Sequence, residues 1–411
     1  MSWNPAPPRR RLICPRFKIM RIGIDARFYG PIGKGLGRYT QEVVDNIIRI
    51  TSAEPGAGFD YVVFLSPDNY DEFVCAEPWV KKVRLALPWY SWSEQLFFPL
   101  YIFKEKIDLM HFPHFNVPIF TPVKFVVTIH DLILTRFPTL RATTLSPWLY
   151  RLKNFGYRLV ISTAVRRARR IIAVSRFTKQ DIISKFPVKA EKIEVIYEGV
   201  ANLAKGQDSL FVAKLDLEET LAQHHIQGEF ILYVGNAYPH KNLDRLLKAF
   251  SRLHQINPAR RLVLVGRDDY FYQQAKAQAR ALNLYQPENQ NSPVIFPGYV
   301  PDAQLEVLYA SARLYVFPSL YEGFGLPPLE AMARGCPVAS SDRASLPEIL
   351  GPAAEYFNPE DESDIVAKLS RLLDDASRRA ELVDLGREQV KKYSWWECAR
   401  LTLEEYRRAL S

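Results

Sequence analysis

Short runs of β-branched and aromatic residues alternate along the chain with segments in which apolar residues recur every three or four positions. The short runs are typical of strands and the longer period is typical of helices. Strands that alternate with helices predict parallel sheets covered by helices, the α/β class. In the first half of the chain the predicted strands are Ile22–Ala26, Tyr61–Leu65, Val83–Leu87, Leu109–Phe112, Phe125–Ile129 and Ile171–Val174.

The same pattern starts again in the second half of the chain. The predicted strands there are Phe230–Val234, Leu262–Val265, Val294–Phe296, Leu314–Phe317, Pro337–Ala339 and Ala354–Phe357. Two such series predict two doubly wound domains. Because ligands bind these sheets outside the carboxyl ends of the strands, two domains facing each other would enclose a ligand-binding cleft.

The two series are separated by residues 201–208, which are polar and follow neither period. We predict a disordered basic leader over residues 1–19, a first domain over residues 20–205 and a second domain over residues 206–392. The leader is rich in proline and arginine and has no apolar core, so it has the features of neither a signal peptide nor a domain. A natural start of translation at Met20 is the alternative expectation.

The composition excludes several classes of protein. Of the 411 residues, 48% are hydrophobic and 13% aromatic, which suffices for ordinary globular cores and excludes disordered and fibrous proteins. No apolar run approaches the roughly 18 residues of a membrane-spanning helix, so an integral membrane protein is not expected. The four cysteines are too far apart for a metal knuckle and too few for a disulfide scaffold, which favours a reducing, cytoplasmic setting.

The net charge of +9 is concentrated in the first half of the chain. Basic residues cluster in residues 166–170, and aromatic side chains cluster earlier, at Trp89, Tyr90, Trp92, Phe97 and Phe98. This combination favours contact with an anionic membrane face or with a polyprenyl-diphosphate acceptor. A solvated basic helix face explains the charge equally well. A nucleic-acid partner is not expected, because no binding motif accompanies the charge.

The densest candidate site follows the predicted strand Leu314–Phe317. Gly323 and Gly325 would let backbone N–H groups approach a ligand closely, and Pro327 and Pro328 suit the first turn of a helix. Gly335 suits the end of that helix, about two turns later. A glycine loop at a helix N-terminus is built to hold a diphosphate.

Two carboxylates, Glu322 and Glu330, flank this expected anion site. Carboxylates beside a phosphate are unfavourable unless they accept hydrogen bonds from neutral hydroxyls, such as those of a sugar and a ribose. The alternative is a helix carboxylate that complements the dipole and a solvated loop glutamate.

The segment Glu322–Glu330, with Gly-Phe-Gly-Leu-Pro-Pro-Leu between the two glutamates, closely resembles the retaining glycosyltransferases of family 4. The resemblance extends over nearly the whole chain, through Gly33–Tyr39, Val174–Lys179, Tyr233–Asn242 and Tyr393–Glu397. It implies the GT-B fold, with two Rossmann-like domains facing a central cleft. It also implies that the first domain binds the acceptor, the second binds the nucleotide sugar, and residues 393–411 form a helix that crosses back to the first domain.

The resemblance assigns roles to the residues of the loop. It implies that Glu322 contacts the donor sugar and that Glu330 contacts the ribose. The N–H groups that would hold the diphosphate are those of Gly323, Phe324, Gly325 and Leu326. Lys241, after the strand Phe230–Val234, would neutralise the departing diphosphate, a role of the oxyanion-stabilising kind. The alternative for Lys241 is a surface lysine at a helix start.

Further candidates rest more heavily on the resemblance. His130 stands where the family has a histidine that faces the donor sugar and the acceptor. Asn236 stands where a basic residue is common, so Arg267 is the candidate for the missing charge. The remaining donor-binding candidates are Gly35 and Gly37, which would close over the phosphate, and Tyr299 and Val300, which would line the nucleobase pocket. Glu198 stands where the family usually has asparagine, and we expect it to alter local capping rather than chemistry.

No metal or other cofactor is expected. No Asp-x-Asp motif follows a strand, and Asp268-Asp269 and Asp374-Asp375 are adjacent pairs in helical context. His111 and His114 enclose a rigid Phe-Pro pair and are expected to form cleft wall rather than a metal site.

Together with these observations, the resemblance implies a metal-independent hexosyltransferase that acts in polysaccharide biosynthesis, at the cytoplasmic side and in peripheral contact with the inner face of the membrane. The segments His240–Asn242 and His130-Asp131 resemble those of mannosyltransferases that build bacterial polysaccharides. GDP-mannose is therefore the preferred donor and a UDP-sugar the other, and the expected acceptor is a glycan or a polyprenyl-diphosphate-linked oligosaccharide. Retention of configuration follows from the resemblance alone. The alternatives are a GT-B sugar-nucleotide epimerase and a non-catalytic two-domain sugar-binding protein. The second alternative is usually exported, and no signal peptide is expected here.

Overall fold

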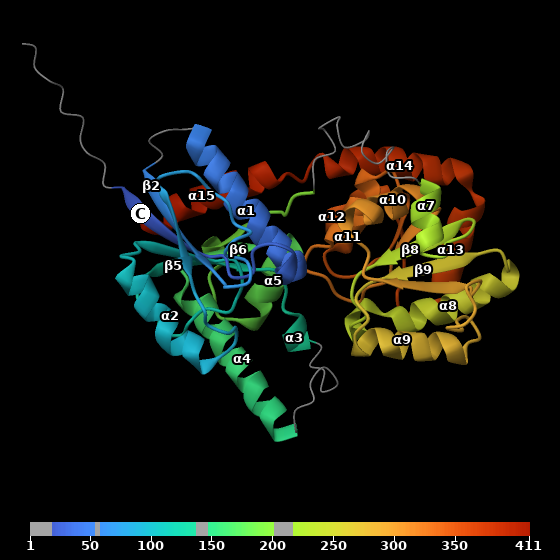
Figure 1. Ribbon diagram of the computed structural model, residues 1–411, viewed down its shortest axis with the longest axis horizontal. Coiled ribbons are helices and arrows are strands. Elements are labelled where there is room, and N and C mark those ends of the chain that lie inside the picture. Colours follow the sequence, from blue (N-terminus) through green and yellow to red (C-terminus); the bar gives the residue numbers. More distant parts are fainter. Residues whose placement is uncertain (1–18, 54–57, 137–146, 201–216) are drawn as a thin grey trace, which may run out of the picture.

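The computed structural model describes residues 19–53, 58–136, 147–200 and 217–411, which form two lobes that lie side by side (Figure 1). Each lobe is a parallel sheet with helices on both faces, as the alternating pattern predicts. The predicted leader, apart from residue 19, and residues 201–208, which separate the two predicted series of strands, lie outside the described residues. Among the residues that the structure describes, none of the helices combines the length and apolar composition that crossing a bilayer requires.

The first sheet has seven parallel strands in the order β3-β2-β1-β4-β5-β6-β7. Their bounds are β1 Met20–Asp25, β2 Phe59–Leu65, β3 Val80–Arg84, β4 Leu109–Phe112, β5 Lys124–Ile129, β6 Arg170–Ala173 and β7 Ile193–Val195. The predicted strand Val83–Leu87 is displaced, because β3 is an edge strand in which lysine and arginine replace the apolar run. The short β7 was not predicted, because three residues are too few to show a period.

The second sheet repeats this topology with six parallel strands in the order β10-β9-β8-β11-β12-β13. Their bounds are β8 Phe230–Val234, β9 Arg261–Val265, β10 Val294–Gly298, β11 Leu314–Phe317, β12 Val338–Ser341 and β13 Ala354–Phe357. All six predicted strands are confirmed, with small differences at their ends. In both sheets the strand order reverses beside the first strand of the series, at β1/β4 and at β8/β11. These are the points where such sheets bind ligands.

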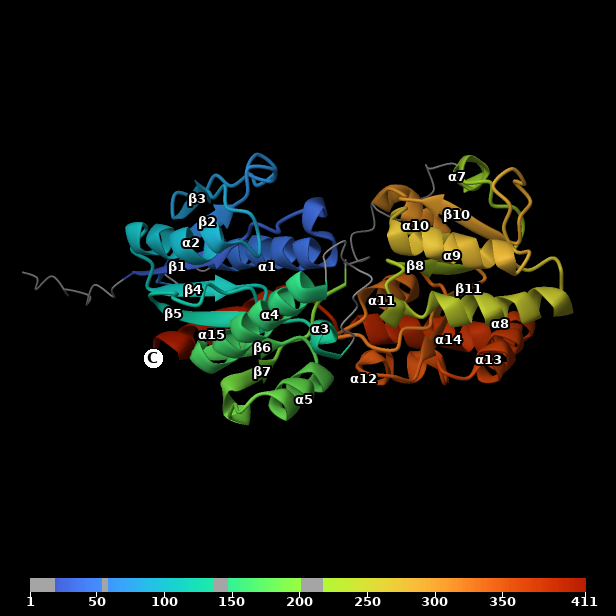
Figure 2. The same cartoon turned by 90° about the horizontal axis from the view of Figure 1, so that it is seen from below.

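Helices cover both faces of the first sheet (Figure 2). Helices α1 (Lys34–Ala53) and α15 (Trp395–Leu410) pack on one face. Helices α2 (Trp92–Lys104), α4 (Pro147–Arg167) and α5 (Arg176–Lys185) share the core of the other face. The short elements of this lobe are η1 (Pro31–Gly33), α3 (Ile133–Arg136) and η3 (Ala190–Lys192).

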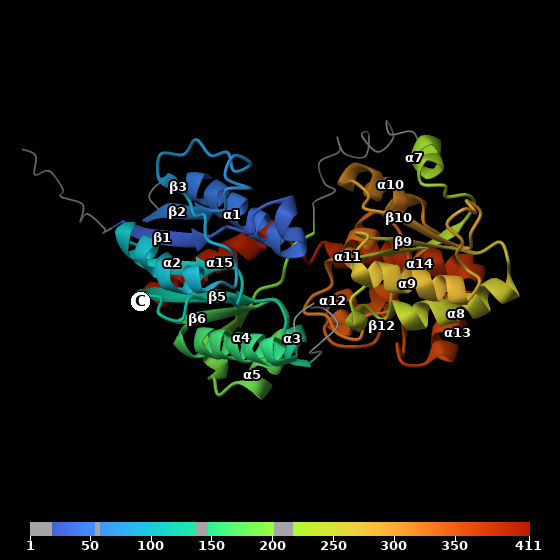
Figure 3. The same ribbon diagram turned by 60° about the horizontal axis from the view of Figure 1, so that its bottom comes forward.

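The second sheet is covered in the same way, and its helices share one core. Their bounds are α7 Leu217–Gln223, η4 Pro239–Lys241, α8 Leu243–Ile256, α9 Tyr270–Ala281, α10 Asp302–Ser311, α11 Leu326–Ala333, α12 Leu346–Leu350, η5 Gly351–Ala353, α13 Glu362–Asp374 and α14 Ala376–Val390. The chain then leaves α14 and returns to the first lobe as α15 (Figures 1 and 3).

Helix α15 is fixed to the first lobe by polar as well as apolar contacts. Its Tyr406 hydroxyl lies 2.6 Å from Nδ1 of His111, whose Nε2 lies 3.0 Å from the Thr128 hydroxyl. His111 is fully buried, and burial lowers its pKa to about 3. The expectation that His111 forms cleft wall is therefore wrong: this side chain joins β4 to α15 inside the core.

Candidate active site

The glycine loop after β11 has bound carbonyl groups and, among the residues described, free N–H groups. The Ser345 hydroxyl donates to the carbonyl oxygens of Glu322 and Phe324, both at 3.0 Å. The Ser175 hydroxyl donates to the carbonyl oxygen of Gly323 at 2.6 Å. In a trans peptide the N–H group points away from the preceding carbonyl. The N–H groups of residues 323–325 therefore point away from these hydroxyls, and none of them has an acceptor within the described part of the chain. Together with the N-terminus of α11 they form a candidate anion site.

Both loop glycines are required by the backbone. A Cβ atom on Gly323 would lie 1.8 Å from the carbonyl oxygen of His130 in the first lobe, a distance no side chain tolerates. Gly325 has a φ of +102° at the N-cap of α11. As predicted, α11 is about two turns long, begins with proline in its first turn and is followed by Gly335 in the left-handed region, with a φ of +72°.

Lys241 and Glu322, predicted to serve the same reaction, lie together. Lys241 Nζ donates to Glu322 Oε1 at 2.6 Å, and each side chain is only 11% exposed. The turn that carries Lys241 is tied to the glycine loop, because the N–H of Leu320 donates to the carbonyl of His240 at 2.7 Å. Asn242 completes that turn with a φ of +61° and donates to the carbonyl of Pro318. A phosphate could replace Glu322 as the partner of Lys241 and leave the carboxylate free to accept from a sugar hydroxyl.

His130 ends β5 and uses both of its ring nitrogens. Nε2 donates to the carbonyl of Pro113 at 2.9 Å, and Nδ1 lies 2.9 Å from Oε1 of Glu198. A carbonyl and a carboxylate both accept, so the arrangement suits the doubly protonated ring. Burial alone would lower the pKa of His130, but the hydrogen bond and charge of Glu198 outweigh burial, and the pKa is raised. The expectation that Glu198 acts on local capping is wrong, because Glu198 pairs with His130.

Asp131 is a site residue that the sequence analysis did not single out. Its Cβ lies 3.2 Å from the position of a Cβ on Gly323, so this first-lobe carboxylate stands against the glycine loop. Burial raises the pKa of Asp131, the N–H of Ile133 opposes this shift, and the charges of Glu322 and Lys241 also act on it. A carboxylate directly after a strand-end histidine was the available signal.

Glu330 contacts the first lobe through Arg38, which follows Gly37 on α1. The Arg38 guanidinium forms an ion pair with Glu330, and the Tyr309 hydroxyl donates to the other carboxylate oxygen at 3.2 Å. A small hollow between the lobes adjoins this ion pair and is lined by Arg38, Val200, Asp302, Leu305, Glu306, Tyr309, Glu330, Ala333 and Arg334. Sequence reasoning missed Arg38, since nothing local shows that α1 reaches the second lobe.

The two glycines at the start of α1 have different surroundings. Helix α1 begins at Lys34, so Gly35 and Gly37 lie in its first turn rather than in a loop before it. A Cβ on Gly37 would lie 2.1 Å from the carbonyl oxygen of Gly30, whereas a Cβ on Gly35 meets nothing within 4 Å. Gly37 is required by packing, and Gly35 leaves open space at the helix N-terminus.

The other donor-binding candidates stand at the carboxyl ends of β8, β9 and β10. The Arg267 guanidinium lies 6.0 Å from the ring centroid of Tyr299, and both side chains are exposed. The Asn236 side chain accepts from the N–H of Tyr238 at 3.3 Å. Val300 is buried in the core of its lobe, so its side chain does not face a ligand.

The lobes are also joined beside the glycine loop. Glu348 on α12 accepts from the N–H groups of Arg176 and Phe177, at 2.8 and 3.0 Å, and so caps the N-terminus of α5 from the other lobe. The Tyr321 hydroxyl donates to Asp181 on α5 at 2.6 Å. These contacts fix the segment Val174–Lys179 against the second lobe.

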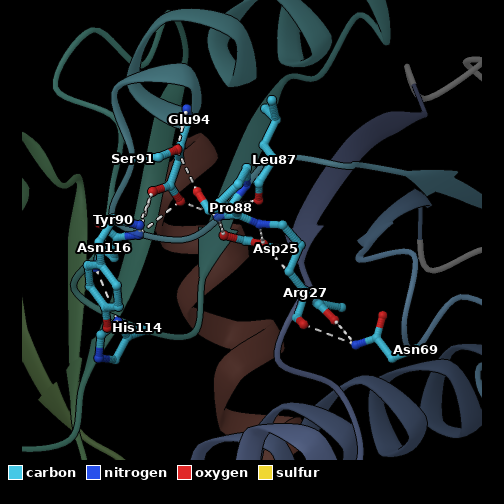
Figure 4. A network of polar contacts seen from close by, with 11 residues as sticks. Asp25, Arg27, Asn69, Leu87, Pro88, Tyr90, Ser91, Glu94, His114 and Asn116 are labelled. Carbon is cyan, nitrogen blue, oxygen red and sulfur yellow. Dashed lines mark hydrogen bonds and ion pairs between the residues drawn. The ribbon is translucent and has the colours of Figure 1, made fainter.

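A buried ionic network supports the loop that follows β1 (Figure 4). Arg27 is wholly buried and donates to both carboxylate oxygens of Asp25 at 2.7 Å, and it also contacts Glu94. Asn116 donates to both oxygens of Glu94, at 2.8 and 2.9 Å. Asn69 donates to the carbonyls of Ala26, Arg27 and Tyr29. The network fixes the chain that leads into α1.

Within the described part of the chain, no three His, Cys, Asp or Glu side chains lie close enough together to hold a metal ion. Asp269 and Asp375 instead cap the N-termini of α9 and α14.

Two family profiles match the two lobes. The profile of Glycosyltransferase Family 4 matches residues 35–201, and that of Glycosyl transferases group 1 matches residues 216–389. The O-antigen chain mannosyltransferase B of Escherichia coli is 34% identical over 246 residues, which are 58% of this chain and 61% of that protein. The serotype-specific mannosyltransferase WbdA of Escherichia coli is 32% identical over 250 residues, 59% of this chain and 29% of that protein. The chain therefore matches less than two thirds of the length of these relatives.

Solved structures share the fold. Sucrose-phosphate synthase from Thermosynechococcus elongatus has a TM-score of 0.70 at 22% identity, over 94% of this chain and 98% of that one. Anabaena HepE, solved with UDP and glucose, has a TM-score of 0.67 at 18% identity, over 95% of this chain and 99% of that one. With the same two-lobed fold, a family profile matched to each lobe and the glycine loop in place, the chain belongs to glycosyltransferase family 4 and has the GT-B fold.

Proposed function

We propose that the protein is a retaining glycosyltransferase that moves a hexosyl unit from a nucleoside diphosphate sugar to a glycan or lipid-linked acceptor. The observation that carries the proposal is the glycine loop, whose carbonyls are bound by Ser345 and Ser175 and whose N–H groups have no acceptor within the described residues. The ion pair of Lys241 and Glu322 stands at the same loop. This arrangement combines donors for a diphosphate, a cation for the developing charge and a carboxylate for sugar hydroxyls.

In the proposed reaction the acceptor oxygen bonds to the anomeric carbon on the face that the diphosphate leaves. The bond between the anomeric carbon and the phosphate oxygen breaks, and the acceptor proton passes to that phosphate oxygen. Asp131 is the first-lobe carboxylate at the loop and is assigned no covalent role. Mass spectrometry of the protein incubated with donor alone should therefore show no added hexose, and a hexose on Asp131 would replace this mechanism with a double displacement.

GDP-mannose is the proposed donor, since both E. coli relatives are named mannosyltransferases, one of them an O-antigen chain mannosyltransferase. A UDP-sugar is the second candidate, because the structural neighbour HepE was solved with UDP and glucose. The proposed acceptor is an oligosaccharide of polysaccharide biosynthesis, free or linked to a polyprenyl diphosphate. A lipid-linked acceptor would place the protein at the cytoplasmic face of a membrane. The comparisons favour neither an epimerase nor a non-catalytic sugar-binding protein.

Binding and slow hydrolysis of GDP-mannose, UDP-glucose, UDP-galactose and UDP-N-acetylglucosamine, with EDTA present, test this proposal. We expect one donor to be selected and turnover to fall by about a hundredfold or more in Glu322→Ala and in Lys241→Ala. Lys248→Ala is the matched control, because Lys248 pairs with Asp244 on the outer side of α8. Unchanged turnover in both site variants would refute the assigned chemistry, and turnover that requires a divalent cation would refute metal independence.

A further inference from the structure

The outer face of α2 is as apolar as its buried face. Glu94, Phe98 and Ile102 point into the core. On the opposite side Trp92 is 84% exposed, Leu96 62%, Leu100 61% and Phe103 78%, and Phe97 beside them is 49% exposed. The only charged residues of this helix are Glu94, which is buried, and Lys104 at its end. A helix that is apolar on all sides is normally covered, so the outer face of α2 indicates a partner.

Exposed apolar side chains also lie on α4, which packs on the same face of the sheet as α2 (Figures 1 and 2). Phe155 and Leu159 on α4 are 65% and 46% exposed. Between the two helices Phe120 is 76% exposed, in a loop held from both sides. Gln95 of α2 accepts from the N–H of Ile119, and Arg167 of α4 donates to the carbonyls of Ile119 and Thr121. The α2–α4 patch therefore comprises Trp92, Leu96, Phe97, Leu100, Phe103, Phe120, Phe155 and Leu159.

A basic hollow lies at the end of α4, where its lining residue Arg166 neighbours Arg167, which holds the loop of Phe120. It has a volume of about 620 Å³ and is lined by Arg166, Arg169, Arg170, Pro187, Val188, Lys189, Glu191, Lys192 and Arg408. Arg170 and Arg408 form ion pairs with Glu194 and Glu405. Arg166, Arg169 and Lys189 are exposed, and no carboxylate of the described segments forms an ion pair with them. Exposed Arg158 and Lys104 add positive charge at the patch itself.

We propose that the α2–α4 patch and the basic hollow together bind an anionic lipid bilayer. The apolar side chains would enter the boundary between headgroups and acyl chains, and the hollow would hold lipid phosphates. The charge selects this occupant over a second copy of the chain, since a twofold contact through the patch would bring two equally basic surfaces together.

The position of the patch suits a lipid-linked acceptor. The patch begins at Trp92, next to Tyr90, whose hydroxyl lies 3.5 Å from Nδ1 of His114 in the loop after β4. That end of α2 stands at the carboxyl edge of the first sheet, where the strand order reverses. Only this relation to the acceptor rests on the proposed function, because bilayer binding needs no sugar substrate.

Co-sedimentation of the full chain with vesicles tests the proposal. We expect binding to vesicles of phosphatidylcholine mixed with phosphatidylglycerol, and much weaker binding to phosphatidylcholine alone. The double variant Leu96→Asp with Leu100→Asp should lose about tenfold or more of the partition coefficient on the mixed vesicles. Arg166→Glu with Arg169→Glu should lose about tenfold on the mixed vesicles and nothing on phosphatidylcholine.

Matched controls lie on the second lobe. Ile256→Asp changes an exposed apolar residue at the end of α8. The double variant Arg387→Glu with Lys391→Glu reverses two exposed charges, one on α14 and one directly after it. Both controls should bind vesicles like the wild type. All variants should retain thermal stability and donor hydrolysis without vesicles, which separates a failure of docking from a failure of the proposed chemistry.

Two results would overturn the proposal. One is a wild-type chain that does not sediment with the mixed vesicles. The same holds if the Leu96/Leu100 variant and the Arg166/Arg169 variant both sediment as strongly as the wild type. The other is light scattering that shows a dimer converted to a monomer by the Leu96 and Leu100 substitutions while vesicle binding is unchanged, which would make a second copy the occupant of the patch.

Discussion

Several side chains at the candidate site form hydrogen-bonded or ionic pairs, and the role of each residue depends on its partner. His130 and Glu198 are the clearest case, because the carboxylate decides the protonation of the imidazole. A protonated His130 beside the glycine loop would add positive charge where a diphosphate is expected. The pair therefore links the pH dependence of the protein to Glu198.

Glu198→Gln should shift this pH dependence downward. The folded-state pKa of His130 is raised, so its contribution to stability is complete below the unfolded value of 6.5 and is lost as the pH rises through the folded value. Removing the charge of Glu198 should lower that pKa, so the alkaline loss of donor hydrolysis begins at lower pH. NMR titration of the His130 ring measures the shift directly.

Glu381→Gln on α14, whose side chain is exposed, is the control and should leave the profile unchanged. A His130 pKa that is the same in Glu198→Gln and in the wild type would contradict the assignment.

Arg27 has a structural role, which depends on the buried carboxylates around it. It compensates two buried carboxylates, Asp25 and Glu94, and burial raises the pKa of Glu94 although Arg27 and Asn116 oppose that shift. The guanidinium is therefore part of the folding of the first lobe rather than of the chemistry.

Arg27→Met should lower the free energy of unfolding of the first lobe by about 3–5 kcal/mol, because two buried charges lose their partner. Urea denaturation measures this loss. Adding Asp25→Asn and Glu94→Gln to Arg27→Met should recover part of it, whereas a single variant as stable as the wild type would show that the network carries no energy.

At the scale of the elements, the two glycines in the first turn of α1 allow a packing role and a ligand-binding role to be tested separately. Gly35→Ala should raise the free energy of unfolding by up to about 1 kcal/mol, since alanine favours helix and meets no atom within 4 Å. Gly37→Ala should lower it, because its Cβ would meet the carbonyl of Gly30.

Donor affinity in the stabilised Gly35→Ala variant then tests the donor-binding role of Gly35. Weaker binding of the nucleotide sugar, measured by calorimetry, is expected if the α1 N-terminus approaches the phosphate. Unchanged affinity would remove Gly35 from the site while leaving the fold intact.

At the scale of the whole molecule, several polar contacts beside the glycine loop join the two lobes. Glu348 accepts from two N–H groups of α5 and from the Tyr197 hydroxyl at 3.0 Å. In the proposed reaction both lobes surround the donor, and their contact would exclude water from the reacting groups.

Glu348→Ala should loosen this contact without unfolding either lobe. We expect a larger radius of gyration by small-angle X-ray scattering and a roughly tenfold lower kcat, with slow donor hydrolysis rising relative to transfer. Glu362→Ala, at the start of α13, is the control. Unchanged scattering and kcat in Glu348→Ala would show that other contacts hold the lobes together.

Local pattern was sufficient for the fold class and for the core of the candidate site. The alternation of strand and helix predicted both sheets, and the glycines and prolines of residues 323–335 predicted the loop and α11. These features depend on residues a few positions apart, whose conformational preferences and periods can be read directly from the chain.

Only the tertiary structure decided which side chains meet across the chain. It buried His111 under α15, paired His130 with Glu198, capped α5 with Glu348 and brought Arg38 to Glu330. It also showed that Phe98 faces the core while Trp92 and Phe97 are exposed. Such contacts depend on how strands order themselves and how the lobes dock, which no local period encodes.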